Sequence, residues 1–365
     1  MPEGAFDDAP PPGFKAVLVA LWLDNLLLAF LVSSVVAVLP AIGADLGATA
    51  VELSLIIAAY TLAQAIFNIL GGRFGDLWGL RRVLLIGMGL LTLMTLGAGM
   101  APNMEILLIL RFLQGMAAAM ISSCSTAIAM NMAPPAARGR VMALLLSSVY
   151  LGLTLGPLVG GGIITLLHWR WLFVVLAVPA LLTWMILRRY IRQEWRCAQG
   201  ETLDISGSLL LSAGLGLLAA GSTGPGVMPE LIWLAPLGIV ALILFVFKER
   251  RTVYPIVDMN MFRRADGLAP ALGAILINYI ATGGVVFLVS LYLQQVRAFA
   301  PLPAALALAV QSVAQVAASL AAGGLSDKQS DWISRVNSPK RSCLERVFLC
   351  EFLHCSRTRS PYHTS

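Results

Sequence analysis

The chain has 365 residues, of which 58% are hydrophobic and 12% are charged, with a formal net charge of +6. These fractions exclude a soluble globular domain, which has fewer apolar and about twice as many charged residues. The positive charge does not indicate nucleic-acid binding, because the lysines and arginines lie in small groups between apolar runs and do not gather on one soluble face.

Ten apolar runs follow one another along the chain. A bilayer core about 30 Å thick is crossed by a helix of about 20 apolar residues, and we expect spans at 17–39, 52–71, 83–101, 104–128, 141–166, 170–187, 205–222, 230–247, 268–293 and 302–324. The sequence therefore predicts an all-α polytopic membrane protein with about ten transmembrane helices. The stretch before the first run is acidic and proline-rich, unlike a signal peptide, so this run is expected to remain as a helix that Pro40 ends.

Basic residues alternate between the connections in a way that predicts orientation. Sixteen lie before the first run or in every second connection after it, whereas the other connections hold only Arg170 and Arg297. Because cytoplasmic loops are enriched in lysine and arginine, we expect a multi-pass protein of the plasma (inner) membrane with a cytoplasmic N-terminus.

The connection between the second and third runs is the most distinctive stretch. It reads Gly-Arg-Phe-Gly-Asp-Leu-Trp-Gly-Leu-Arg-Arg from Gly72 to Arg82, and we expect a short polar hairpin at the membrane surface. Its glycines, including Gly72 and Gly79, permit a tight reversal, Asp76 can cap a helix or pair with an arginine, and Arg81 and Arg82 suit headgroups. A generic basic turn is the alternative. The pattern resembles the loop between helices 2 and 3 of the major facilitator superfamily, although Leu77 replaces a usual basic residue.

A degenerate second copy, Gly323-Gly324-Leu325-Ser326-Asp327-Lys328, follows the tenth run. Two copies in corresponding places are expected of a pseudo-symmetric transporter. The resemblance then implies an inserted helix pair, as in the fourteen-helix drug:proton antiporter branch, and a chain truncated at its C-terminal end. We accordingly expect a cytoplasmic tail 1–16, a six-helix bundle 17–198, the inserted pair 199–250, the first two helices of a second bundle 251–325 and an irregular tail 326–365.

Two further motifs carry functional expectations from the family. Arg111, with Gln114 and Gly115 at i+3 and i+4, lies about 10 Å inside the fourth run, where an arginine is costly unless it has a partner. The resemblance implies proton coupling for Arg111 and Gln114, and snorkelling to the interface is the alternative. In the fifth run Gly152, Gly156 and Gly160 share one face. With Pro157 and Gly161 they resemble the antiporter motif of exporters, although close helix packing alone explains the glycines.

The first run departs from the family, because Leu31 stands where the fourteen-helix branch has an aspartate. Asp24 lies two turns earlier on nearly the same face, about 12 Å into the helix. Our hypothesis is that Asp24 carries the proton, since an acid held away from water takes up a proton more readily. The alternative is an aspartate satisfied by Asn25 or by a neighbouring helix end.

Several polar residues in the runs are candidates for a central cavity, although hydrogen bonds between helices explain such residues equally well; they are Tyr60, Gln64, Asn68, Asn278 and Gln311. Cys343, Cys350, His354 and Cys355 match no common zinc spacing, and we expect no metal or other cofactor. No nucleophile has a paired histidine, so we expect no enzyme.

These features predict a proton-coupled exporter of small hydrophobic or cationic compounds. We expect it to work as a monomer by alternating access, with the bilayer, protons and a small-molecule substrate as partners and no nucleic acid. A facilitator or importer of the same fold, or a truncated fragment that does not transport, are the alternatives.

Overall fold

The computed structural model describes residues 13–134, 137–196, 204–223, 229–252, 255–256, 268–297, 307 and 310–325. The expectations for the ends of the chain, 1–12 and 326–365, lie outside these residues. So do the cysteines and the histidine considered for zinc, and the last three residues of the second loop motif.

The described part of the chain is helical. Its elements are α1 (Phe14–Leu46), α2 (Ala50–Trp78), α3 (Leu80–Gly99), α4 (Met104–Met132), α5 (Arg138–Leu166), α6 (Arg170–Tyr190), α7 (Ile205–Thr223), η3 (Pro229–Trp233), α8 (Leu234–Glu249), α10 (Leu268–Leu291) and η4 (Tyr292–Val296). A further apolar helix covers Val310–Leu325. Among the described residues, seven helices are long and apolar enough to cross a membrane and three more are shorter apolar helices, so the prediction of about ten helices is confirmed.

Two helix ends were predicted wrongly. Pro40 does not end the first helix, because α1 continues to Leu46. The residues beyond the proline are held by packing, since Ile42 is fully buried and Arg170 Nη1 donates to Asp45 Oδ2 at 2.5 Å. The expected hairpin is also much shorter, because α2 runs to Trp78 and α3 begins at Leu80.

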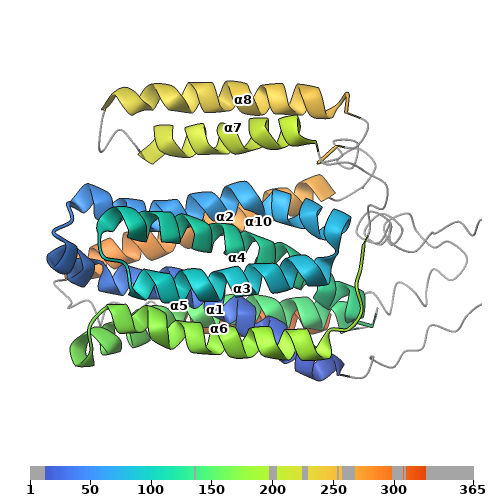
Figure 1. The fold of residues 1–365 in the computed structure, drawn as a ribbon, viewed down its shortest axis with the longest axis horizontal. Coiled ribbons are helices and arrows are strands. Elements are labelled where there is room, and N and C mark those ends of the chain that lie inside the picture. Colours follow the sequence, from blue (N-terminus) through green and yellow to red (C-terminus); the bar gives the residue numbers. More distant parts are fainter. Residues whose placement is uncertain are drawn as a thin grey trace, which may run out of the picture.

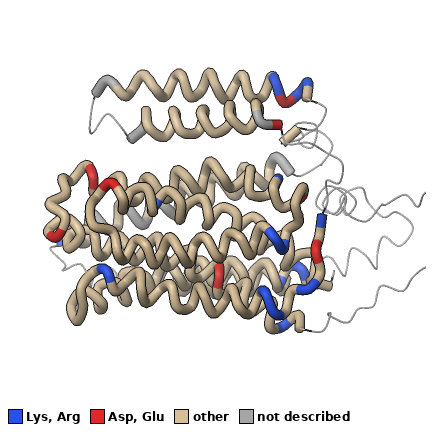
Figure 2. The backbone as a smooth tube through the Cα atoms, viewed as in Figure 1, with Lys and Arg blue, Asp and Glu red and all other residues tan. Residues whose placement is uncertain are grey.

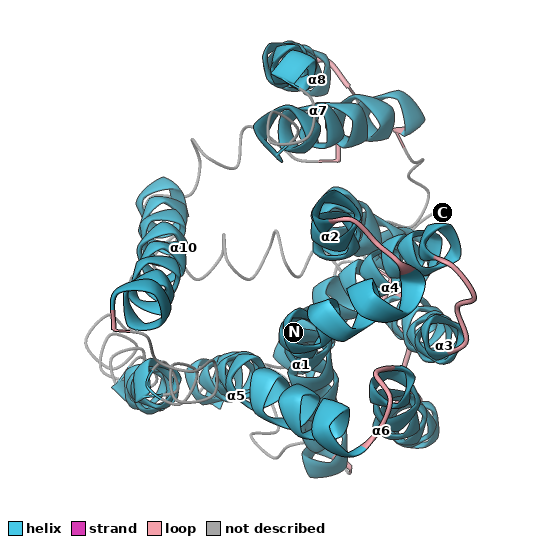
Figure 3. Ribbon diagram, turned by 90° about the vertical axis from the view of Figure 1, so that its left-hand side faces the viewer, coloured by secondary structure: helices cyan, strands magenta, loops and turns pink. Residues whose placement is uncertain are grey.

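Helices α1–α6 pack together, and the largest helix contacts are those of α1 with α5 and of α2 and α3 with α4 (Figure 1). The buried residues of the core come almost entirely from these six helices. Helix α7 packs on α8 and more lightly on α2. Figure 3 shows α7 and α8 beside α2, and α10 on the side of the molecule opposite α3 and α6.

Charged residues gather at the two ends of the helices, and the lysines and arginines concentrate at one of them (Figure 2). We call this the basic end: it is where α1 begins and α2 ends. At the opposite end Asp45 contacts Arg170 and accepts a hydrogen bond from Trp169 Nε1 at 3.1 Å. Arg170 Nη2 also donates to the Ala101 carbonyl at 3.2 Å, so this cluster ties α1 to α6 and to the α3–α4 connection.

Candidate functional site

Asp24 lies inside the helix bundle, with its side chain 1% exposed. Asn25 Nδ2 donates to Asp24 Oδ1 at 2.8 Å and lies 3.2 Å from Ser125 Oγ of α4. Asp24 Oδ2 is buried and accepts no hydrogen bond from the described part of the chain. The local alternative, satisfaction by Asn25, therefore accounts for one carboxyl oxygen and leaves the other available for a proton.

Arg111 is also inside the bundle, at 1% exposure, and does not reach the interface as the snorkelling alternative requires. Its Nη1 donates to Gln114 Oε1 at 2.8 Å, and its Nε donates to the Ile56 carbonyl at 3.4 Å. The guanidinium carbon lies 4.8 Å from the centre of the Tyr60 ring, a cation–π contact. Gln114 Nε2 then donates to Thr95 Oγ1 at 3.1 Å, so one polar network joins α2, α3 and α4.

No carboxylate forms an ion pair with Arg111 within the described residues. Its charge is compensated by carbonyl oxygens and an aromatic face. Burying a charge with such partners costs free energy. Arg111 and Gln114, the positions found from the motif, contact each other. Their role in proton coupling is not tested by this geometry.

The glycines of α5 meet α1 at very close range. A Cβ atom added to Gly152 would lie 2.5 Å from the Leu26 carbonyl oxygen, and one added to Gly156 would lie 2.8 Å from the Ser34 amide nitrogen. Ser33 Oγ donates to the Gly152 carbonyl at 3.1 Å across the same contact. The shared face expected from i+4 spacing is therefore confirmed. Gly161 and Pro157 differ, since neither is buried and a Cβ at Gly161 would meet nothing within 4 Å.

The polar connection at the basic end reverses direction at a single residue, Gly79. Its φ of +113° disfavours any side chain. Asp76 and Gly72 lie within α2, so of the two roles expected for Asp76 the capping of a helix start is excluded. The first turn of α3 is instead held by Glu194. This carboxylate accepts from the Arg81 and Arg82 amides at 2.9 and 3.4 Å. Arg81 Nε donates to the Ile191 carbonyl at 2.6 Å, so the segment after α6 is fixed to the motif.

Glu194 was not predicted from the sequence. It is the only acid in the arginine-rich stretch Arg188–Arg196. A single acid among arginines just after a helix was the one sign in the sequence that this residue has a structural role. A carboxylate at the start of α3 also interacts favourably with the helix dipole.

The cavity candidates do not form one site. Tyr60 is completely buried beneath Arg111, so it does not line an open cavity as predicted. Asn68 accepts a hydrogen bond from Ser122 Oγ at 3.3 Å, a contact between α2 and α4. Gln64 and Gln311 are partly exposed, and Asn278 on α10 is exposed and hydrogen-bonded to Tyr150.

Comparisons with known proteins agree with this architecture. The model of the Major Facilitator Superfamily matches residues 21–339. The chain is 31% identical over 255 residues to multidrug resistance protein Stp of Mycobacterium tuberculosis, covering 67% of this chain and 46% of that protein. It is 30% identical over 316 residues to a lincomycin resistance protein of Streptomyces lincolnensis, covering 85% and 65%. The chain thus spans about half to two-thirds of the length of these relatives.

Solved structures give the same fold. The proton:xylose symporter XylE superposes with a TM-score of 0.57 at 15% identity, covering 85% of this chain and 68% of that one. The human organic anion transporter MFSD10 superposes with a TM-score of 0.50 at 18% identity, covering 94% and 90%. Motifs, helix packing and these similarities together establish that the chain belongs to the major facilitator superfamily.

Proposed function

We propose that this chain is part of a secondary active transporter that exports small hydrophobic or cationic compounds in exchange for protons. The observation that carries the proposal is the buried Asp24, whose Oδ2 has no hydrogen-bond partner in the described part of the chain. Relatives named for multidrug and lincomycin resistance support export as the direction.

In this proposal Asp24 binds a proton and Asn25 orients its carboxyl group. Access to Asp24 alternates between the two sides of the membrane, and a proton moving inward through 100 mV releases about 2.3 kcal/mol. A pH difference of one unit adds about 1.4 kcal/mol. Arg111 and Gln114 tie the neighbouring helices into a unit that moves as a whole, and the glycine contact between α1 and α5 sets where α1 can shift.

The basic end is assigned to the cytoplasm, because lysine and arginine are retained there. With this assignment the start of α1 and the Gly79 turn face the cytoplasm. The helices cross the inner membrane. We propose that the unit that transports is a monomer.

Reconstituted liposomes test the proposal directly. The 365-residue chain is placed in liposomes with an acidic lumen, and ethidium uptake and lumen pH are followed together. Antiport predicts that ethidium enters while the lumen pH rises, and that Asp24→Asn lowers both rates at least tenfold. Glu105→Gln, which removes an exposed carboxylate from the first turn of α4, is the matched control and leaves both unchanged.

Two results contradict the proposal. Ethidium entry without a change in lumen pH identifies a facilitator or importer. No ethidium movement by the unaltered chain identifies a fragment that does not transport by itself.

A further inference from the structure

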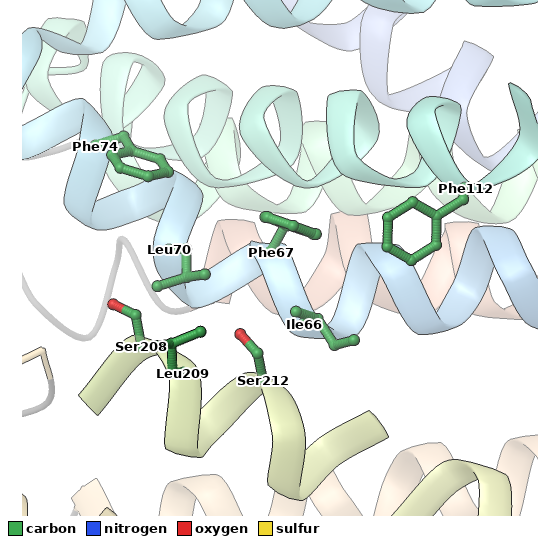
Figure 4. Close-up of a pocket in the computed structure, with 8 residues that line it drawn as sticks. All are labelled: Ile66, Phe67, Leu70, Phe74, Phe112, Ser208, Leu209 and Ser212. Atoms are coloured by element: carbon green, nitrogen blue, oxygen red, sulfur yellow. The ribbon is translucent and has the colours of Figure 1, made fainter. Parts of the chain in front are cut away.

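An apolar groove of about 350 Å³ lies outside the six-helix bundle, between α2 and α7. Its walls are apolar side chains of α2, including Phe67 and Phe74, together with Phe112 of α4 and Leu209 of α7 (Figure 4). Ser208 and Ser212 of α7 are its polar members, and Figure 4 shows both side chains pointing toward α2. None of the residues discussed for proton coupling lines this groove.

The depth of the groove matches one leaflet of a bilayer. Phe74 is one turn from the end of α2 at Trp78, and Ser208 is one turn from the start of α7, so the groove begins at the basic end. Ile66, its deepest residue on α2, is twelve residues before Trp78, which is about 18 Å at 1.5 Å per residue. Half of a hydrocarbon core is about 15 Å.

Positive charge lies at the end of α8, which an ion pair joins to the residue before α7. Ser208 Oγ donates to the Asp204 carbonyl at 2.7 Å, and the Asp204 carboxylate forms an ion pair with Lys248 at the end of α8. Arg250 and Arg251 come two and three residues after Lys248, beyond the buried Glu249, and both are exposed. Because Lys248 is already paired with Asp204, these two arginines supply the positive charge that an anionic headgroup at this level would meet.

We infer that the groove binds an acyl chain of an anionic phospholipid from the leaflet at the basic end, with its phosphate held by Arg250 and Arg251. Water is a poor occupant, because the aromatic and aliphatic walls offer it too few polar partners. The light packing of α7 on α2 leaves apolar surface that an acyl chain covers.

Native mass spectrometry of the purified chain tests this inference. The protein is stripped of lipid and equilibrated with equal amounts of dioleoyl phosphatidylglycerol and dioleoyl phosphatidylethanolamine. We expect one tightly retained phosphatidylglycerol per chain. Ser212→Trp, which fills the groove, should lower its retention at least tenfold, whereas Ile243→Trp on the exposed side of α8 should retain it.

The headgroup contact is tested separately by Arg250→Gln with Arg251→Gln. This double variant should lower the preference for phosphatidylglycerol over phosphatidylethanolamine by roughly tenfold while an acyl chain remains bound. If Ser212→Trp fails to fold, the double variant still tests whether the lipid is bound at this groove. Equal retention of phosphatidylglycerol by all variants would show that the lipid is ordinary annular lipid and would overturn the inference. Displacement of the lipid by ethidium would assign the groove to transported compounds and would also overturn it.

Discussion

The contact between α1 and α5 gives a sharp prediction, because two glycines of α5, five residues apart, have completely different surroundings. A methyl group at Gly156 would lie 1.9 Å from Ser33 Oγ and 2.8 Å from the Ser34 amide nitrogen. A methyl group at Gly161 would meet no atom of another described helix within 4 Å. Gly156→Ala and Gly161→Ala are therefore the same chemical change with opposite structural consequences.

The cost at Gly156 can be divided into two parts. Ser33 can rotate away, but its hydrogen bond to the Gly152 carbonyl is then lost, at about 0.6 kcal/mol for such a bond between membrane helices. The Ser34 nitrogen belongs to the backbone, so α1 itself must shift, and overpacking of this kind costs about 1–3 kcal/mol. We expect Gly156→Ala to lower the free energy of unfolding by about 2–3 kcal/mol. Gly161→Ala should be neutral or should stabilise the helix by up to about 1 kcal/mol.

The measurement is unfolding in mixed micelles by titration with sodium dodecyl sulfate, followed by tryptophan fluorescence. A double-mutant cycle with Ser33→Ala separates the two parts of the cost. Removing the hydroxyl relieves the 1.9 Å contact and leaves the backbone contact, so the double variant should recover about 0.5–1.5 kcal/mol. Equal stability of Gly156→Ala and Gly161→Ala would refute the close approach of α1 and α5.

Three further changes have expected results. Glu194→Gln keeps an acceptor for the Arg81 amide but loses the charge at the start of α3, and should lower stability by about 0.5–1 kcal/mol. Arg111→Lys cannot span from Gln114 to the Tyr60 ring and should lower stability by about 1–3 kcal/mol. Although partial burial opposes ionisation of Asp204, hydrogen bonds from Lys248, the Gly207 amide and Ser206 hold its pKa below the usual range. Its stabilising effect is thus complete above about pH 4 and is lost as the pH falls through the lowered pKa, so Asp204→Asn should remove this part of the acid sensitivity.

Thermal melting of detergent-solubilised protein measures all three. For Asp204 the readout is the difference between the unaltered chain and the variant, compared at pH 6 and below pH 4. A difference that does not shrink with acidification would contradict the ion pair with Lys248.

Much of the fold is predictable from the sequence, because the length of an apolar run decides whether it can cross a bilayer. The shared face of Gly152, Gly156 and Gly160 also follows from helical spacing alone. The end of α2 does not, since Arg73 and Asp76 are polar but remain helical where the helix leaves the hydrocarbon. Polarity marks the membrane boundary, and it does not mark the end of a helix.

Contacts between residues far apart in the chain could not be predicted from the sequence, for a different reason. Asn25 meets Ser125 a hundred residues away, and hydropathy carries no information on which helix faces meet. Glu194 was missed in the same way, because its partners are backbone amides of α3. A backbone amide has no signature in the sequence that would reveal its partner.

Asp24 and Arg111, the two buried charged residues in the described part of α1–α6, are compensated independently. Asn25, which holds Asp24, contacts α4 at Ser125, and this residue is fourteen positions after Arg111, or about 21 Å along the helix. An ion pair between Asp24 and Arg111 is therefore excluded in this arrangement, since it needs about 4 Å. Arg111 has Gln114, the Ile56 carbonyl and the Tyr60 ring, whereas Asp24 has Asn25 as its one hydrogen-bond partner among the described residues.

This asymmetry has a consequence for coupling. A carboxylate with one buried, unpartnered oxygen is costly when ionised, so the packing around Asp24 suits its protonated form. In the proposed exchange, loss of the proton would favour an arrangement of the helices that brings water or a cationic compound to that oxygen. A proton that changes the relative stability of two arrangements is what an exchange mechanism requires. An acid placed two turns before Leu31 can therefore meet the same requirement from a different position in α1.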